Sequence, residues 1–209
     1  VHVIYETPTD NISRAQIVDA IRALNDDYRR LNSDTVKTRQ LFKGVAADIE
    51  IQFELAKLDP QGNCTEGITR TYSTLTENAN DNVKSSSVRP AWNNKKYLNI
   101  WVVRSISRPG ATNILGYATF PTNGGNPPFN DGIILRNDQM GTIGTAVLPT
   151  LGGPQFGRTL THEAGHYFGL YHTFQRGCFA QGDTCANTTS ALEANYGCNT
   201  NINSCSNDI

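Results

Sequence analysis

The chain has 209 residues, enough to bury a substantial hydrophobic core, and this length favours one domain. Charged residues make up 18% of it and the formal net charge is -1, which excludes the broad positive field that binding to nucleic acid or an anionic membrane surface would need. No apolar run approaches the ~20 residues that cross a bilayer, so we expect no membrane insertion. The N-terminus lacks the basic start and cleavage site of a signal peptide, so we expect an already processed chain.

The first part of the chain predicts a strand, an amphipathic helix and a second strand. Val1–Tyr5 is β-branched and aromatic, as strands are. Ser13 is followed three residues later by Gln16 in a capping-box arrangement, and apolar residues then recur every three or four positions to about Leu31. Apolar and polar side chains alternate over Ile49–Leu55, which predicts a half-buried strand.

The second part predicts three more strands and one more helix. Apolar runs at Tyr97–Val103, Ile114–Phe120 and Gly132–Leu135 are typical of buried strands. The pattern turns helical over Gln155–Phe168 and becomes irregular beyond His172. Together these elements predict an α/β (α+β) fold, with a mixed sheet and two main helices.

Three of the four histidines fall within eleven residues, from His162 to His172. Helix positions four apart share a face, so His162 and His166 can converge on one zinc ion at about 2.0–2.1 Å. Glu163 follows the first ligand by one residue and points beside the metal, where it can take a proton from the water that zinc activates. Gly169 can end the helix in a left-handed conformation, so that His172 reaches the same ion. The sequence therefore predicts a catalytic zinc site.

Two other interpretations explain less of this cluster. Surface histidines on an amphipathic helix, with Gly169 as an ordinary C-cap, would leave Glu163 and the spacing of the third histidine unexplained. A serine-type triad lacks a GxSxG elbow, and only His2 lies outside the cluster. A zinc hydrolase that acts on a non-peptide amide stays open as an alternative.

These residues match HExxHxxGxxH, and the chain resembles the pappalysin (cytophagalysin) family of metzincin zinc peptidases. Four further segments resemble that family: Asp59–Asn63, Gly67–Arg70, Leu115–Pro121 and Gly132–Ile133. The resemblance implies a secreted zinc-dependent endopeptidase that acts on protein or peptide substrates as a monomer. Its catalytic zinc would be held by His162, His166 and His172, with Glu163 as the general base.

The resemblance also implies a two-lobed metzincin-type catalytic domain over residues 1–209. The upper lobe, 1–169, would carry the twisted mixed sheet and the two helices. The lower lobe, 170–209, would be small, irregular and stapled by disulfides. An extended peptide could add to the sheet edge that borders the cleft, although that strand could equally serve core packing. The residues expected to bind substrate there are Leu115, Gly116, Tyr117 and Ala118.

Four of the five cysteines lie in the last 32 residues, a stretch with little apolar content. We expect disulfides there, because no CxxC pair supports the alternative, a cysteine zinc knuckle. Disulfides in turn indicate an extracellular or secretory setting. By family resemblance, Cys178 pairs with Cys205 and Cys64 with Cys185, which leaves Cys198 without a partner in this chain.

One feature departs from the family pattern. Metzincins carry a methionine turn beneath the zinc, whereas the single methionine here, Met140, precedes the zinc helix. We therefore expect a chain truncated before that turn. This keeps open a second function, a catalytically impaired zinc-containing peptide-binding domain.

A calcium site is also implied by the resemblance. The lower lobe of the family binds structural calcium, and Asp183, Cys185 and Thr188 fit the ligand positions. Oxygen donors on a loop suit calcium, which takes six to eight of them. The alternative is an Asx-type turn without an ion.

Overall fold

The computed structural model describes residues 1–111, 113–121, 130–147, 157–178, 182–186, 188–195 and 204–205. The chain divides into two compact units, Val1–Tyr167 and Phe168–Ile209. All regular helices and strands found in the described ranges belong to the first unit. None of those helices has the length and apolar content to cross a membrane.

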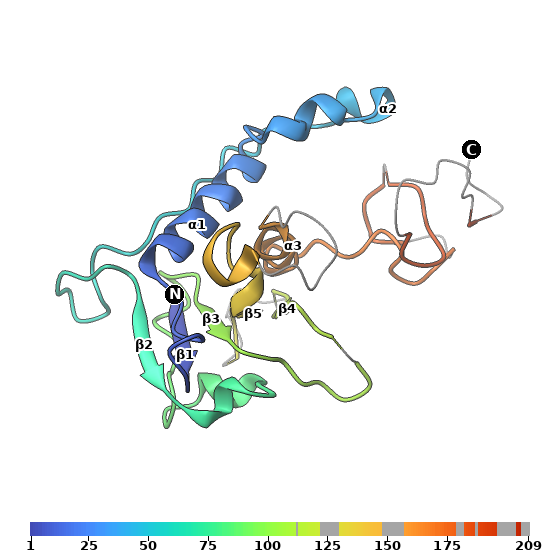
Figure 1. Ribbon diagram of the computed structural model, residues 1–209. Coiled ribbons are helices and arrows are strands. Elements are labelled where there is room, and N and C mark those ends of the chain that lie inside the picture. Colours follow the sequence, from blue (N-terminus) through green and yellow to red (C-terminus); the bar gives the residue numbers. More distant parts are fainter. Residues whose placement is uncertain are drawn as a thin grey trace. The chain divides into compact units, whose positions relative to one another are not determined.

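A five-stranded mixed sheet forms the centre of the first unit and confirms the expected α/β fold class (Figure 1). In spatial order the strands are β2 (Thr69–Tyr72), β1 (His2–Tyr5), β3 (Ile100–Val103), β5 (Ile133–Arg136) and β4 (Gly116–Ala118). The first four are parallel to one another, and β4 pairs antiparallel with β5. Strand β4 therefore lies at an edge of the sheet.

The helices are α1 (Arg14–Tyr28), α2 (Gln40–Lys43) and α3 (Arg158–Tyr167). Buried side chains of α1 and α3 pack on one face of the sheet and form the larger core: Ile17, Ala20, Leu24, Leu160 and Ala164 against Val3, Ile100, Val102, Ile133 and Leu135. The opposite face buries Trp101 and Ile134 with Ala79 and Val83. Short 3-10 helices complete the unit at Ser33–Lys37, Thr74–Thr76, Asp81–Lys84, Asn137–Gln139 and Gly144–Val147.

Helix α1 begins at the predicted cap, where the hydroxyl of Ser13 accepts the N–H of Gln16 at 3.1 Å. The side chain of Gln16 does not return to Ser13 as a capping box would require. It is buried, and it donates to the carbonyl oxygens of Asn137 and Met140 at 2.9 and 3.0 Å. This glutamine therefore fastens the start of α1 to the chain that follows β5.

The predicted strand over Ile49–Leu55 is wrong, since no ladder forms there. The side-chain amide of Asn25 in α1 bonds both the N–H and the C=O of Phe53, at 2.7 and 2.9 Å. The predicted alternation of burial holds from Ile51 to Leu55 but not at Ile49, which is exposed, and Ile51 and Phe53 pack against the larger core. The pattern therefore predicts which side chains of Ile51–Leu55 are buried, but the backbone of Phe53 bonds to the side chain of Asn25 and not to a neighbouring strand.

His2 is a buried core residue, only 2% exposed. Its two ring nitrogens lie 2.7 Å from Thr69 Oγ1 and 3.0 Å from Asn99 Oδ1. Burial lowers the pKa of this imidazole to about 3, so the ring is neutral at physiological pH. The one histidine outside the cluster is thus accounted for by packing and hydrogen bonding between β1, β2 and the start of β3.

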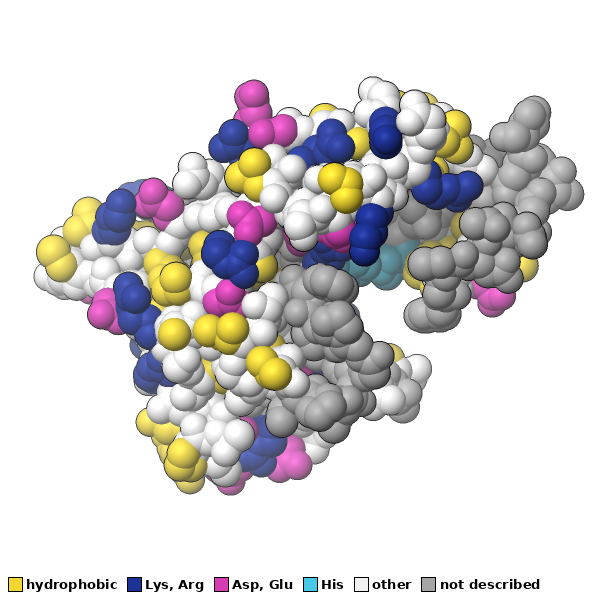
Figure 2. Space-filling model, turned by 45° about the horizontal axis from the view of Figure 1, so that its top comes forward, with side chains coloured by type: hydrophobic (Ala, Val, Ile, Leu, Met, Phe, Trp, Pro, Cys, Tyr) yellow, Lys and Arg dark blue, Asp and Glu magenta, His cyan; other side chains and the backbone are white. Residues whose placement is uncertain are grey.

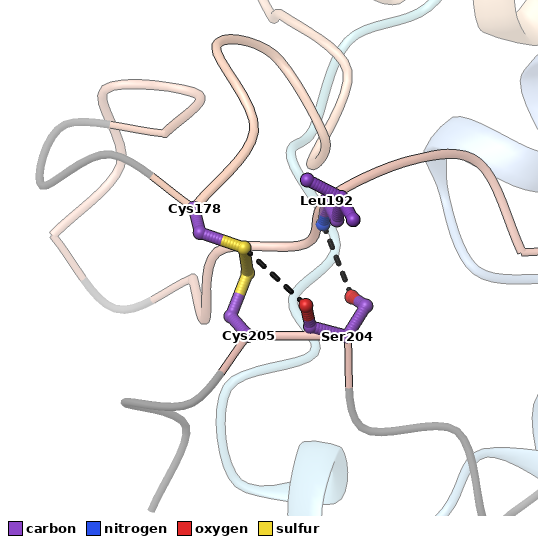
Figure 3. The surroundings of a disulfide bond; sticks show 4 residues. All are labelled: Cys178, Leu192, Ser204 and Cys205. Carbon is purple, nitrogen blue, oxygen red and sulfur yellow. Dashed lines mark hydrogen bonds between the residues drawn. A yellow bond between two sulfur atoms is a disulfide. The ribbon is translucent and has the colours of Figure 1, made fainter.

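The second unit is held by a disulfide between Cys178 and Cys205, the pair that the family resemblance implies (Figure 3). The bridge spans 27 positions, and closing a loop of that length contributes about 3.5 kcal/mol in the chain-entropy model. The N–H of Leu192 donates to Ser204 Oγ at 3.0 Å beside the bridge. Cross-linking therefore orders a segment that has no helix or strand within its described residues.

The expected pairing of Cys64 with Cys185 is wrong, because both are free thiols at exposed positions. The backbone of Cys64 forms an isolated antiparallel β-bridge with Leu58, and the N–H of Cys185 donates to Asp183 Oδ1. A resemblance can suggest partners, but a disulfide also needs Cβ atoms within about 4.5 Å, which no sequence pattern reports. Cys198 lies outside the described residues.

Candidate metal centre

Helix α3 places His162 and His166 one turn apart, and their ring centroids are 4.5 Å from each other. His166 is buried and His162 exposed. The ring of His166 also lies 5.1 Å from that of Phe120, just after β4. Histidine side chains form one patch on the face shown in Figure 2.

The chain turns sharply after α3, because Gly169 has a φ of 94° in the left-handed region that glycine adopts without strain. The ring of His172 then stacks on Phe174, with centroids 4.7 Å apart. One ligand nitrogen from each of His162, His166 and His172 lies within 4.8 Å of the others. Within the described ranges this is the single group of three or more potential metal ligands.

The donor set fits a zinc ion. Imidazole nitrogens suit zinc, and three of them with one open position are a ligand set of catalytic zinc sites. In a tetrahedral site with Zn–N distances of about 2.0–2.1 Å, the ligand nitrogens are about 3.3 Å apart. The ligand nitrogens here lie within 4.8 Å of one another, close enough for all three to face one ion.

Glu163 lies beside this cluster and is buried, with 5% of its surface exposed. Burial raises the pKa of its carboxyl group to about 7, while a hydrogen bond from the backbone N–H of Ala118 and the charge of Arg108 act in the opposite direction. The oxygen Oε2 is buried and has no hydrogen-bond partner in the described part of the chain. A buried carboxylate oxygen in this state is suited to accept a proton from a bound molecule.

Strand β4 presents main-chain groups along the sheet edge. The carbonyl of Leu115 accepts the N–H of Arg136, and the N–H of Thr119 donates to the carbonyl of Gly132. In an antiparallel pair such bonds alternate, so the N–H and C=O groups of Gly116 and Ala118 point away from β5.

The other face of β4 packs into the core. Tyr117 is buried in the smaller cluster, and its hydroxyl donates to Asp81 Oδ1 at 3.0 Å. Core packing, one of the two roles expected of this strand, is therefore present, and it leaves the edge itself available.

A family model described as pregnancy-associated plasma protein-A, Peptidase_M43, matches residues 79–209. The chain belongs to this family of metzincin peptidases. An extracellular metalloprotease of Sordaria macrospora is 39% identical over 114 residues, which are 53% of this chain and 36% of that protein. One from Pyricularia oryzae is 38% identical over 113 residues, 54% of this chain and 36% of the relative. The chain thus spans little more than a third of the length of these relatives.

The fold of this M43 chain is similar to that of mature mirolysin from Tannerella forsythia, solved in complex with a cleaved peptide. The TM-score is 0.79 at 38% sequence identity, and the match covers 91% of this chain and 69% of mirolysin. Another mirolysin structure, in complex with a compound, matches with a TM-score of 0.75 and 38% identity over 88% of this chain.

In the M43 chain, the expected calcium residues lie in a hydrogen-bonded turn. Asp183 is 7% exposed, and its Oδ1 accepts the N–H of Cys185 at 2.9 Å. The N–H of Thr188 donates to the carbonyl of Cys185 at 3.1 Å. This is the Asx-type arrangement that the sequence left open as the alternative.

Two contacts of the site could not be found from the sequence. The N–H of Ala118 is a backbone group, and the close approach of Gly116 to Glu163 depends on the placement of β4 against α3. Both belong to a segment that the family resemblance marked for substrate binding. The resemblance gave no indication that the segment also contacts Glu163.

The histidine cluster predicts about one zinc ion per chain. Changing both His162 and His166 to Ala should abolish zinc binding, because two of the three imidazole ligands are removed. Elemental analysis of the purified protein after dialysis measures this. The matched control is His2→Asn, which alters the buried histidine of β1 and should leave the zinc content unchanged. Full zinc content in the double variant would contradict the ligand assignment.

Proposed function

We propose that the protein to which this chain belongs is a secreted zinc-dependent endopeptidase in which Glu163 is the general base. The observation that carries this proposal is the buried Glu163 carboxylate, whose Oε2 has no partner within the described residues, next in sequence to a three-histidine cluster. Membership of the M43 family and the mirolysin-like fold support the peptidase activity. The extracellular relatives and the Cys178–Cys205 disulfide support secretion.

Zinc, when bound by the three histidines, supplies Lewis-acid chemistry: it acidifies water and polarises the carbonyl of the scissile peptide. Glu163 takes the proton of the attacking water on Oε2 as the new C–O bond forms. The hydrogen bond from Ala118 holds the carboxylate in place, and the raised pKa of Glu163 favours holding that proton. Glu163 then donates it to the amine nitrogen as the C–N bond breaks, so one carboxylate serves as base and then as acid.

Substrate would bind along the edge of the sheet. An extended peptide can add beside β4 through the main-chain groups that point away from β5. In this proposal the edge that binds substrate is formed by Leu115, Gly116, Tyr117 and Ala118. The side chain of Tyr117 points into the core and bonds to Asp81. The structure of mature mirolysin in complex with a cleaved peptide supports a peptide substrate.

Glu163→Gln tests the role of the base directly in the full-length protein. The amide keeps the shape of the side chain but cannot take a proton, so we expect kcat for peptide cleavage to fall about 10²- to 10⁴-fold with zinc content unchanged. Glu66→Gln is the matched control, because that carboxylate is 69% exposed and pairs with Arg14. Near-normal turnover by Glu163→Gln would remove this residue from its role. An inactive wild-type protein that still binds peptides would instead favour the impaired binding domain.

We also propose that Asp183, the carbonyl of Cys185 and Thr188 bind structural calcium, which would order the second unit together with the disulfide. The support is the buried Asp183 carboxylate in a segment with few apolar side chains. Calcium should raise the melting temperature of zinc-saturated protein, and Asp183→Ala should abolish that increase. Asp138→Ala, in the first unit, is the control. A melt that calcium does not change would leave the Asx-type turn as the full description of this loop.

A further inference from the structure

Strand β4 approaches Glu163 more closely than any residue with a side chain at position 116 would permit. A Cβ atom added to Gly116 would lie 3.0 Å from Glu163 Cγ, 2.9 Å from Leu135 Cδ1 and 3.2 Å from the carbonyl oxygen of Ile134. Non-bonded carbon atoms are at their optimum about 3.5–4.0 Å apart, so these contacts are repulsive. Gly116 has no positive φ. The fold therefore needs this glycine for its missing side chain and not for its backbone freedom.

The three neighbours differ in how easily they could move. Leu135 is fully buried in the larger core, and the oxygen of Ile134 belongs to the backbone of β5. Glu163 is less restrained, because its Oε2 has no hydrogen-bond partner among the described residues. A methyl group on Gly116 would therefore displace the side chain of Glu163 before it displaced the sheet.

We propose that Gly116 is a positioning residue for Glu163. Its hydrogen-only side chain leaves the space into which the Cγ methylene of Glu163 fits, and the outward N–H of Ala118 then holds the carboxylate. Between them, Tyr117 points to the opposite face of the sheet, where its hydroxyl donates to Asp81. The role of Gly116 rests on the proposed function of Glu163 as the base.

Gly116→Ala in the full-length, zinc-loaded protein tests this role. We expect kcat to fall about 10- to 100-fold, since a misplacement of up to 1 Å at a reacting group has effects of that size. KM should change less than about 3-fold and the zinc content should not change, because the added methyl group faces Glu163 and leaves the main-chain groups of the proposed peptide edge and the histidines in place. A crystal structure of the variant should show the Glu163 carboxylate displaced away from β4.

Gly44→Ala is the matched control, because a Cβ there would meet nothing within 4 Å and the residue has a helical φ of -73°. Its kinetic constants should equal those of the wild type. A normal kcat in Gly116→Ala, or a raised KM with kcat unchanged, would overturn the positioning role. If Glu163→Gln is inactive while Gly116→Ala is normal, only this inference fails. If Glu163→Gln is active, the proposed function itself fails.

If Gly116→Ala does not fold, a second variant tests whether β4 positions Glu163. Ala118→Pro removes the N–H that bonds Glu163, at a position where that group points away from β5 and no ladder bond is lost. We expect the same fall in kcat with the zinc content held, and a raised KM, because the same N–H belongs to the proposed substrate edge. An unchanged kcat in this variant would overturn the claim that β4 positions the carboxylate.

Discussion

The site depends on one contact, that of helix α3 with the edge strand β4. Burial raises the pKa of Glu163 and the N–H of Ala118 in this strand opposes the shift, while Oε2 has no partner among the described residues. The same helix carries His162 and His166, so the position of α3 on the sheet places the proposed base and two of the candidate metal ligands together. The chemistry of the site thus follows from where one edge strand lies against one helix.

A polar cluster on the opposite face keeps that strand in place. Asp81 accepts hydrogen bonds from Tyr117 in β4 and from Asn130, and Lys84 lies 3.0 Å from it. The Lys84 side chain is 3% exposed, with its ammonium group 5.3 Å from the ring centroid of Trp101. Burial lowers the pKa of Lys84, and the hydrogen bond and charge of Asp81 oppose this shift. Buried charges are costly unless they are paired. Loss of any member of this cluster would therefore leave a buried polar group unpaired and would weaken the attachment of β4.

Local physical rules made much of the site readable from the sequence. The helical repeat and the glycine turn bring His162, His166 and His172 together, and uniform apolar runs marked the buried strands. Interactions between distant segments were not readable. The alternation over Ile49–Leu55 predicted the burial of Ile51, Phe53 and Leu55 but not the exposure of Ile49, and it could not show that Asn25 would take the place of a neighbouring strand. Strand β2 was missed because its side chains are alternately half-buried and exposed at the other sheet edge. The expected pairing of Cys64 with Cys185 failed because it too depends on how distant segments lie.

The central claim is that β4 holds Glu163 beside the zinc ligands but outside the coordination shell. A crystal structure of the zinc-loaded full-length protein, with the metal located by anomalous scattering, tests it most directly. The account predicts nitrogens of His162, His166 and His172 at about 2.0–2.1 Å from zinc, with the Glu163 carboxylate bonded to the N–H of Ala118 and not to the metal. A carboxylate oxygen of Glu163 at about 2.0–2.2 Å from zinc would contradict it, because a ligand cannot also be the base.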